Sequence, residues 1–404
     1  MNVLWGIFGM FIVLSIAFLL SNKKKSIKLR TILGGLGIQL FFAFIVLQWE
    51  TGREALKWFT LRVQNVIDYA GEGIGFLFGS LADGEQFGTI FAFHILPVII
   101  FFSALISVLY YLGIMQWFIK IIGGGLSKLL GTSKSESMSA AANIFVGQTE
   151  APLVVRPYLS KMTNSELFAV MTGGLASVAG SVLIGYSLLG VPLEYLLAAS
   201  FMAAPAGLIM AKIMMPETEQ SETSDEIKIV KDTETTNVID AAARGASDGL
   251  KLALNVGAML LAFIALIALL NGMLGAVGGW FGFGDITIQG ILGYLFAPLA
   301  FAIGVPWSEA VTAGSFIGQK LVLNEFVAYA AFTLQMAELS EKTIVVVSFA
   351  LCGFANFSSM AILLGGLGGL APERRKDIAR LGLRAVAAGM LASLLSASIA
   401  GMFF

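Results

Sequence analysis

The chain has 404 residues, of which 57% are apolar and only 13% are charged. A soluble domain carries about 25% charged residues, so roughly half of the charge expected for a soluble protein is absent. The 25 Lys and Arg residues nearly balance the 26 Asp and Glu residues, which argues against a nucleic-acid partner because such partners require a basic surface. One cysteine and one histidine exclude an intrachain disulfide and most histidine-rich metal sites. Composition therefore indicates a polytopic membrane protein.

Apolar segments recur along the whole chain. A helix of about 20 apolar residues crosses a hydrocarbon core of about 30 Å, and we expect eight such spans. They are residues 2–20, 32–47, 90–119, 167–189, 195–215, 249–274, 343–367 and 378–403. The first span lacks a basic start and basic residues follow it directly, so we do not expect it to be a cleavable signal peptide. Arg53, Lys57 and Arg62 lie in a stretch typical of an amphipathic helix at the membrane surface.

Two further segments, residues 139–159 and 307–334, are poor candidates for spans. The first is interrupted by Gly147 and Pro152, and the second by Gly314 and Gly318. Charged residues near the centre of a lipid-facing helix cost about 2.5–3.5 kcal/mol each. We therefore interpret both segments as re-entrant hairpins whose bends are buried in protein, which gives an all-α fold of eight transmembrane helices and two opposed hairpins. Their polar residues are Asn143, Gln148, Thr149, Glu150 and Arg156 in the first, and Glu309, Gln319, Lys320, Asn324 and Glu325 in the second.

Basic residues mark the cytoplasmic side of a membrane protein. They cluster at residues 23–30, 120–134 and 374–376, and the first hairpin is basic on both flanks. We therefore expect this hairpin to enter and leave the membrane from the cytoplasm, with Thr163 and Glu166 forming a capping box at the start of the next helix. The arrangement predicts a multi-pass protein of the plasma (inner) membrane with both termini outside. The basic residues of the amphipathic stretch then lie outside, a mild violation of the rule.

Residues 216–240 form a long hydrophilic stretch with eight acidic residues. We expect a mobile cytoplasmic linker that is not part of the site. The two halves that it separates resemble each other, since each has a hairpin with a Gly-Gln pair and a later glutamate, followed by an interrupted apolar helix. Inverted repeats with broken helices are typical of secondary transporters. We expect three regions, namely N-terminal helices with the interfacial helix (1–83), a gate-like first repeat (90–190) and a C-terminal transport region with the second hairpin (195–404).

Glu150 and Glu325 are the strongest candidates for functional residues, because a carboxylate beside a break in a membrane helix is rarely accidental. The structural alternative is an ion pair of each with Arg156 or Lys320. Gln148 and Thr149 either line a polar ligand cavity or satisfy backbone groups at the bend. Asn356 and Ser359, three residues apart on one helical face just after Phe354, either bind a ligand or make a helix–helix contact.

Other polar residues give weaker signals. We expect His94, near Pro97 in an apolar helix, to be a packing residue rather than a proton relay. Residues 282–285 match the GxGD pattern of intramembrane aspartyl proteases, but no second aspartate in a neighbouring apolar span completes the pair. No HExxH or P-loop motif is present either. We therefore do not expect an enzyme.

Three segments resemble signature sequences of the concentrative nucleoside transporters. They are GQTEAP at 147–152, GQKLVLNEFVAY at 318–329 and CGFANFSS at 352–359, and the similarity extends in order over essentially the whole chain. The resemblance implies a homotrimer with one pathway per protomer, embedded in lipid, that imports a nucleoside such as uridine together with a cation. A passive channel for small polar solutes is the alternative that the residues leave open.

The resemblance also implies a role for individual residues. Gln148, Thr149 and Glu150 would meet the nucleobase, whereas Glu325, Asn356 and Ser359 would hold the ribose and Phe354 would pack near the ligand. Amides and hydroxyls match the alternating donors and acceptors of a base edge, and a carboxylate accepts from both ribose hydroxyls. Sodium-coupled members bind the ion with oxygens at positions that match Asn143, Val146, Ser177 and Val178. We therefore favour a sodium ion over a proton as the coupling ion, with no other cofactor.

Overall fold

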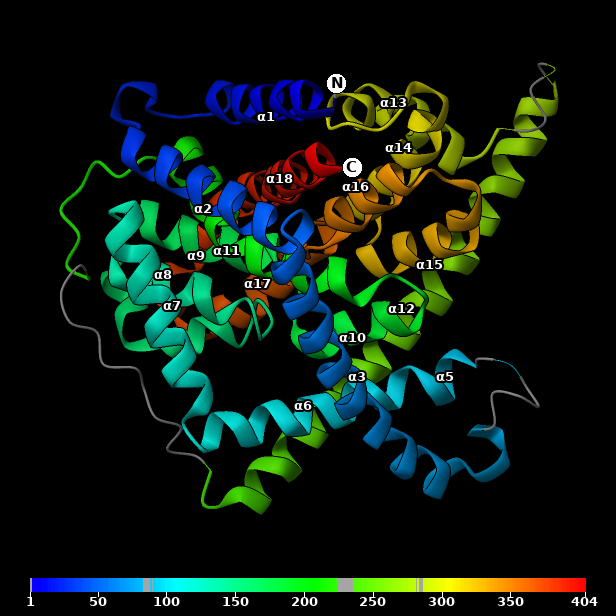
Figure 1. Cartoon of the computed structure of the whole chain (residues 1–404), viewed down its shortest axis with the longest axis horizontal. Coiled ribbons are helices and arrows are strands. Elements are labelled where there is room, and N and C mark those ends of the chain that lie inside the picture. The colour runs from blue at the N-terminus through cyan, green and yellow to red at the C-terminus, as the bar shows by residue number, and fades with distance from the viewer. Residues whose placement is uncertain (1, 83–87, 89, 224–234, 281, 283–285) are drawn as a thin grey trace.

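The computed structural model describes residues 2–82, 88, 90–223, 235–280, 282 and 286–404. All regular elements in these residues are helices, which confirms the predicted all-α class (Figure 1). The first half contains α1 (Asn2–Leu19), α2 (Leu29–Leu47), α3 (Glu50–Phe78), α5 (Phe91–His94), α6 (Leu96–Tyr111), α7 (Ile114–Leu130), α8 (Lys134–Ala142), the 3-10 helix η3 (Ala151–Lys161), α9 (Asn164–Ala176), α10 (Gly180–Leu188) and α11 (Leu193–Met214). The second half contains α12 (Val238–Trp280), α13 (Ile288–Ala302), α14 (Trp307–Val322), α15 (Glu325–Gln335), α16 (Glu341–Leu351), α17 (Phe357–Leu370) and α18 (Arg375–Ala400). Short 3-10 turns η1 (Lys24–Ser26), η2 (Gly79–Ala82), η4 (Met336–Glu338), η5 (Pro372–Arg374) and η6 (Gly401–Phe403) complete the described elements.

Seven helices or helix runs in the described residues are long and apolar enough to span a membrane, or eight if the bent pair α13–α14 counts as one. Three of them are mostly buried in protein, namely α9–α10, α11 and α18, whose apolar windows are 94%, 89% and 83% buried. The windows of α1 and α12 are only 22% and 17% buried. Large apolar side chains such as Leu4 and Phe41 are exposed on this periphery. Helices that expose apolar faces around a buried helical core are the arrangement expected in lipid.

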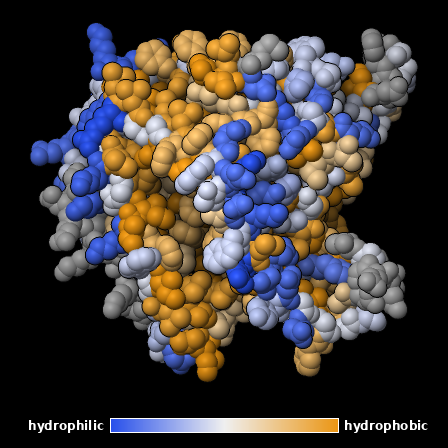
Figure 2. All heavy atoms as spheres, in the orientation of Figure 1, coloured by the Kyte–Doolittle hydropathy of each residue, from blue (hydrophilic) through white to orange (hydrophobic). Residues whose placement is uncertain are grey.

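Figure 2 shows this apolar surface, interrupted by a band of polar side chains that follows α3. The α3 helix is 29 residues long and buries only Gly52, Ile67 and Ala70. Its exposed charged residues include Arg53 and Lys57. A helix with apolar and charged residues on its surface has the character expected of the amphipathic helix that was predicted for this stretch.

The longest helix, α12, packs along α6 (Figure 1). Two glycines four residues apart make this contact close. A Cβ atom on Gly245 would lie 2.6 Å from the Ser103 carbonyl oxygen, and one on Gly249 would lie 2.8 Å from Ile100 Cα. Small residues at this spacing let two membrane helices approach backbone to backbone.

The same order of elements occurs twice. In the first half α8 is separated from η3 by the irregular residues 143–150, α9 is separated from α10 by residues 177–179, and α11 follows. In the second half α14 is separated from α15 by residues 323–324, α16 is separated from α17 by residues 352–356, and α18 follows. The predicted span 343–367 is therefore two short helices, α16 and α17. The broken helices bring irregular backbone into the protein interior, where other segments can form hydrogen bonds with its free N–H and C=O groups.

The prediction that Gly314 and Gly318 interrupt the second hairpin is wrong. The α14 helix continues through both, and the break comes later, at Leu323 and Asn324. The two glycines instead face α13, which makes a 116° bend with α14. A Cβ atom on Gly314 would lie 2.6 Å from the Gly293 carbonyl oxygen, so glycine is required for close packing rather than for a turn.

Candidate functional site

The two helix breaks, one from each half, touch at the centre of the molecule. The backbone N–H of Phe354 donates to the carbonyl oxygen of Ser177 at 3.1 Å. A Cβ atom on Gly353 would lie 3.0 Å from the Ala176 carbonyl oxygen, so a larger residue at this crossing would require the α9 backbone to shift by a few tenths of an ångström. The freed backbone groups of one break thus partly satisfy those of the other.

Glu325 and Asn356 lie together beside this crossing. Asn356 is the N-cap of α17, and its Oδ1 accepts a hydrogen bond from the Ser359 N–H at 2.8 Å. Its Nδ2 donates to Glu325 Oε2 at 3.0 Å. Asn356 and Ser359 are therefore close because one caps the helix that contains the other, and not because both lie on a helical face as predicted. All three side chains are buried.

The bend of the first segment reaches the same cluster. Gln148 Nε2 donates to Ser359 Oγ at 3.5 Å, and a Cβ atom on Gly366 would lie 2.6 Å from Thr149 Cγ2. The structure thus brings Gln148 and Thr149 against the helix that carries Ser359. The side-chain oxygen Oε1 of Gln148 is buried and accepts no hydrogen bond from the described residues, so it is free to accept one from a ligand.

Glu150 and Phe354 lie at the margin of the cluster. Glu150 is exposed, and its carboxylate accepts a hydrogen bond from the Thr149 hydroxyl at 2.9 Å. No hydrogen bond or ion pair within the described residues joins Glu150 to Glu325 or Asn356. Phe354 is half-buried next to Asn356. The structure therefore gathers Glu325, Asn356 and Ser359 tightly and leaves Glu150 outside this hydrogen-bonded group.

The four residues matched to a sodium site lie in the first bend and the first helix break. A Cβ atom on Gly174 would lie 2.8 Å from Gln148 Cβ, so the α9 glycine lets the bend approach the helix. Asn143 Oδ1 is buried without a donor among the described residues. Ser177 is buried and uses its hydroxyl hydrogen on the Gly173 carbonyl, which leaves its oxygen free to accept. Val146 and Val178 are buried in the same two irregular stretches.

Of two buried residues near Glu325, Lys320 was considered from the sequence only as an ion-pair partner, and Tyr186 was not identified at all. The Tyr186 hydroxyl, on α10, donates to Glu325 Oε1 at 3.0 Å. The Lys320 ammonium, on α14, donates to the Ala350 carbonyl at 2.7 Å and to Ser393 Oγ at 2.8 Å. The available signal was a tyrosine within an otherwise apolar broken helix and a lysine in the apolar surroundings of α14, but neither indicates its partner.

The contacts also bear on the ion pairs proposed as structural alternatives for Glu150 and Glu325, and on the role of His94. In the part of the chain that the structure describes, neither Glu150 nor Glu325 forms an ion pair with Arg156 or Lys320. His94 has both ring nitrogens within 3.0–3.1 Å of backbone atoms of Ile90 and Ala82, as expected of a packing residue. Asp285 lies outside the described residues.

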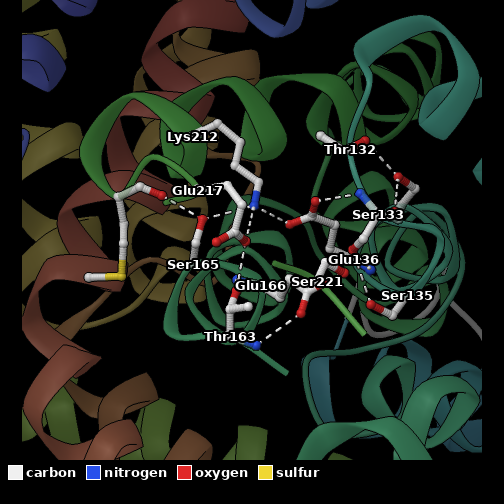
Figure 3. Close-up of polar contacts among 12 residues, drawn as sticks. Thr132, Ser133, Ser135, Glu136, Thr163, Ser165, Glu166, Lys212, Glu217 and Ser221 are labelled. Atoms are coloured by element: carbon white, nitrogen blue, oxygen red, sulfur yellow. Dashed lines mark hydrogen bonds and ion pairs between the residues drawn. The ribbon is translucent and has the colours of Figure 1, made fainter. Parts of the chain in front are cut away.

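A second polar cluster lies at the base of the first hairpin segment (Figure 3). Lys212, near the end of α11, forms an ion pair with Glu136 of α8 at 2.6 Å and donates to Ser165 of α9 at 2.9 Å. Glu136 and Glu166 also complete capping boxes with Ser133 and Thr163 at the starts of α8 and α9, which confirms the predicted Thr163–Glu166 box. This base cluster therefore ties together the ends of three helices.

The first residues of the acidic stretch join this base cluster. Thr223 is buried and donates to Glu166 Oε1 at 2.6 Å, and Ser221 donates to the same oxygen. Glu217 accepts from the Thr163 hydroxyl at 2.7 Å. The prediction of a mobile linker from residue 216 onward is therefore wrong for residues 216–223, because three helix ends offer hydrogen-bond partners to its polar side chains.

The arrangement is that of a multi-pass membrane protein with a polar site where broken helices cross, a class that includes the secondary transporters. The sequence matches "Na+ dependent nucleoside transporter C-terminus" over residues 195–401 and the corresponding N-terminus over residues 8–81. A third match, "Gate: Nucleoside recognition", covers residues 92–192. The chain belongs to the concentrative nucleoside transporter family, whose members are transporters and not enzymes.

Relatives cover the chain from end to end. It is 63% identical to the uncharacterized transporter YutK of Bacillus subtilis, with 100% of both chains aligned. It is 51% identical to the nucleoside permease NupC of Helicobacter pylori, with 99% of this chain and 97% of that one aligned. Among solved structures it matches CNTnw in an inward-facing substrate-bound state with a TM-score of 0.96 and 57% identity, covering 100% of this chain and 98% of that one.

Proposed function

We propose that this chain is a symporter that imports nucleosides across the plasma membrane, driven by a sodium gradient. The observation that carries the proposal is the cluster of Glu325, Asn356, Ser359 and Gln148, in which residues of both halves meet beside two crossed helix breaks. Family membership supplies the substrate class, since the relatives include a protein named nucleoside permease and one named sodium/nucleoside cotransporter.

The chemistry of the cluster suits a nucleoside. Vicinal ribose hydroxyls are two adjacent donors, and the Glu325 carboxylate can accept from both. Gln148 and Thr149 provide an amide and a hydroxyl, which can donate to or accept from a base edge, and Glu150 provides a further acceptor. Phe354 offers an aromatic face beside them. In a dry site, a ligand lacking one hydroxyl would leave the carboxylate incompletely hydrogen-bonded and would bind less tightly.

A sodium ion suits the first bend. Sodium is a hard cation that prefers neutral and anionic oxygens, and broken helices supply such oxygens in transporters. The buried Asn143 Oδ1 without a donor among the described residues is the kind of group that a cation satisfies. The Ser177 hydroxyl and the backbone carbonyls of Val146 and Val178 would complete the set. A proton remains the second candidate for the coupling ion.

The transport activity is tested with purified protein in lipid vesicles. We expect radiolabelled uridine to accumulate inside above its outside concentration under an inward sodium gradient. A passive channel, the alternative function, can equilibrate uridine but cannot concentrate it. Absence of uptake for every common nucleoside would contradict the proposal.

The identity of the ion is tested at fixed pH by replacing sodium with choline. We expect the unaltered protein to lose uptake in choline. We expect uptake by the Asn143→Ala variant to be the same in sodium and in choline. We expect Ser177→Ala to raise the sodium concentration for half-maximal uptake. Full uptake in choline that a protonophore abolishes would favour the proton instead.

We also propose the topology and assembly that the family resemblance implies, a homotrimer with both termini outside. Contacts at the helix ends support the placement of both termini on one side, since Asn2 donates to the Phe404 carbonyl. At the other ends of the same helices, Arg384 donates to the carbonyls of Leu20 and Met214, beside the basic loop after α1. We retain the division into regions 1–83, 90–190 and 195–404, which the three family matches support.

A further inference from the structure

Tyr186 holds one side of the Glu325 carboxylate. Its hydroxyl donates to Oε1 at 3.0 Å, while Asn356 Nδ2 donates to Oε2 at 3.0 Å. Tyr186 has no exposed surface, and Glu325 is 5% exposed. Tyr186 comes from the first repeat and Asn356 from the second, so the two oxygens of one carboxylate are held by different halves of the chain.

The Tyr186 ring is itself fixed by aromatic packing. Its centroid lies 4.6 Å from that of Phe326 and 4.5 Å from that of Tyr329. A Cβ atom on Gly185 would lie 3.2 Å from Phe326 Cζ, which shows how closely α10 approaches α15. The Tyr329 hydroxyl donates to the Ser348 carbonyl at 2.7 Å and so anchors this aromatic cluster to α16. Close packing of this kind restricts the ring, and the Tyr186 hydroxyl is therefore a donor at a fixed position.

Glu325 depends on neutral donors. Within the described residues it forms no ion pair, because Lys320 directs its ammonium to the Ala350 carbonyl and Ser393 Oγ. A buried carboxylate without an ion-pair partner is costly unless it is hydrogen-bonded, so each of its donors has a large effect. Each carboxylate oxygen has two lone pairs, so the carboxylate can accept from a ligand besides Tyr186 and Asn356.

We propose that Tyr186 is a positioning residue that holds the Glu325 carboxylate in the plane in which it accepts both vicinal hydroxyls of a ribonucleoside. Tyr186 thereby strengthens selection for an intact ribose without touching the sugar. This inference rests on the proposed function and identifies how that site discriminates between sugars.

The test uses Tyr186→Phe, which keeps the packed ring and removes the hydroxyl. Uptake of uridine and 2′,3′-dideoxyuridine is measured in lipid vesicles. We expect KM for uridine to rise about 10- to 100-fold, the effect of losing one hydrogen bond to a charged group, with little change in the maximal rate. KM for dideoxyuridine should stay the same, because that ligand has no diol for the carboxylate to accept from.

Tyr329→Phe is the matched control. It removes a second hydroxyl from the same aromatic cluster, but that hydroxyl contacts Ser348 rather than Glu325, so we expect the preference for uridine to be unchanged. In a Glu325→Gln background, Tyr186→Phe should have no further effect on the preference, because the carboxylate through which it acts is gone.

The outcomes separate this inference from the proposed function. If the unaltered protein transports neither nucleoside, the proposed function is wrong. If it prefers uridine and Tyr186→Phe keeps that preference, only the positioning role is wrong. Equal losses for both ligands, or an equal loss of preference with Tyr329→Phe, would show that the hydroxyl does not act on the sugar through Glu325.

Discussion

Asn356 uses the two ends of its amide for different purposes. Its oxygen caps α17 through the Ser359 N–H, and its nitrogen donates to Glu325. Asparagine is among the best N-cap residues, and of the good caps it alone also offers an N–H₂ donor on the same short side chain. The residue therefore sets both where α17 begins and how Glu325 is held.

Asn356→Ser should separate the two roles. Serine caps helices as well as asparagine does, so we expect α17 to keep its start, and loss of the amide donor to the buried Glu325 should lower the free energy of unfolding by about 1–3 kcal/mol. The donor to Glu325 is lost, and uridine affinity should fall about tenfold or more. Thermal unfolding in detergent and a uridine binding titration measure the two effects. Loss of stability with unchanged affinity would indicate that the amide stabilises the fold without acting on the ligand.

At this scale the sequence motifs identified the residues but not their partners. Glu325, Asn356 and Ser359 could be selected because polar groups in apolar segments are conspicuous. Tyr186 could not, since a tyrosine in a membrane helix has many uses and its contact with Glu325 spans 139 positions along the chain. Pairings over such separations depend on the crossing of the helices, which no local pattern specifies.

Among the contacts between elements, the base cluster contains a buried ion pair. Lys212 is 7% exposed and Glu136 is 1% exposed, so both charges are shielded from water. Removal of one partner from a buried ion pair leaves an uncompensated charge, whereas exposed pairs contribute little. The cluster therefore joins α8, α9 and α11 into one rigid end beneath the first bend.

Lys212→Met should lower the free energy of unfolding by about 3–5 kcal/mol, because Glu136 remains buried without its partner. The double variant Lys212→Met/Glu136→Gln should recover most of the loss. Lys251→Met is the control, since Lys251 and Asp248 form a pair that is 71% and 74% exposed. Thermal unfolding measures all three variants, and equal effects of Lys212→Met and Lys251→Met would contradict the buried ion pair.

Local rules predicted the elements better than their interruptions. The spans at α1, α2, α11 and α18 follow from apolar length, and the Thr163–Glu166 box follows from its four-residue pattern. Gly314 and Gly318 were misinterpreted, because glycine permits both a turn and a close helix contact, and only the neighbouring helix decides between them. The packing of residues 216–223 was missed for a related reason, since an acidic stretch is hydrophilic whether or not helix ends bind it.

For the whole molecule, composition and repeat order were enough to predict an all-α membrane protein with paired breaks. They were not enough to predict that the breaks touch. The contact of Phe354 with Ser177 joins the two repeats through backbone atoms, which every residue has, so no side-chain signal marks it. Global geometry of this kind arises from packing rather than from any segment alone.

That backbone contact has a thermodynamic consequence. Ser177 belongs to the proposed sodium site and Phe354 to the proposed nucleoside site, so an ion that orders one break also orders the other. Heterotropic linkage then requires reciprocity, in that sodium must tighten uridine binding by the same factor by which uridine tightens sodium binding, commonly about 5- to 150-fold. Calorimetric titrations of each ligand with and without the other measure both factors. They should be equal, and Asn143→Ala should reduce both together; unequal factors would show that a third species binds in the cycle.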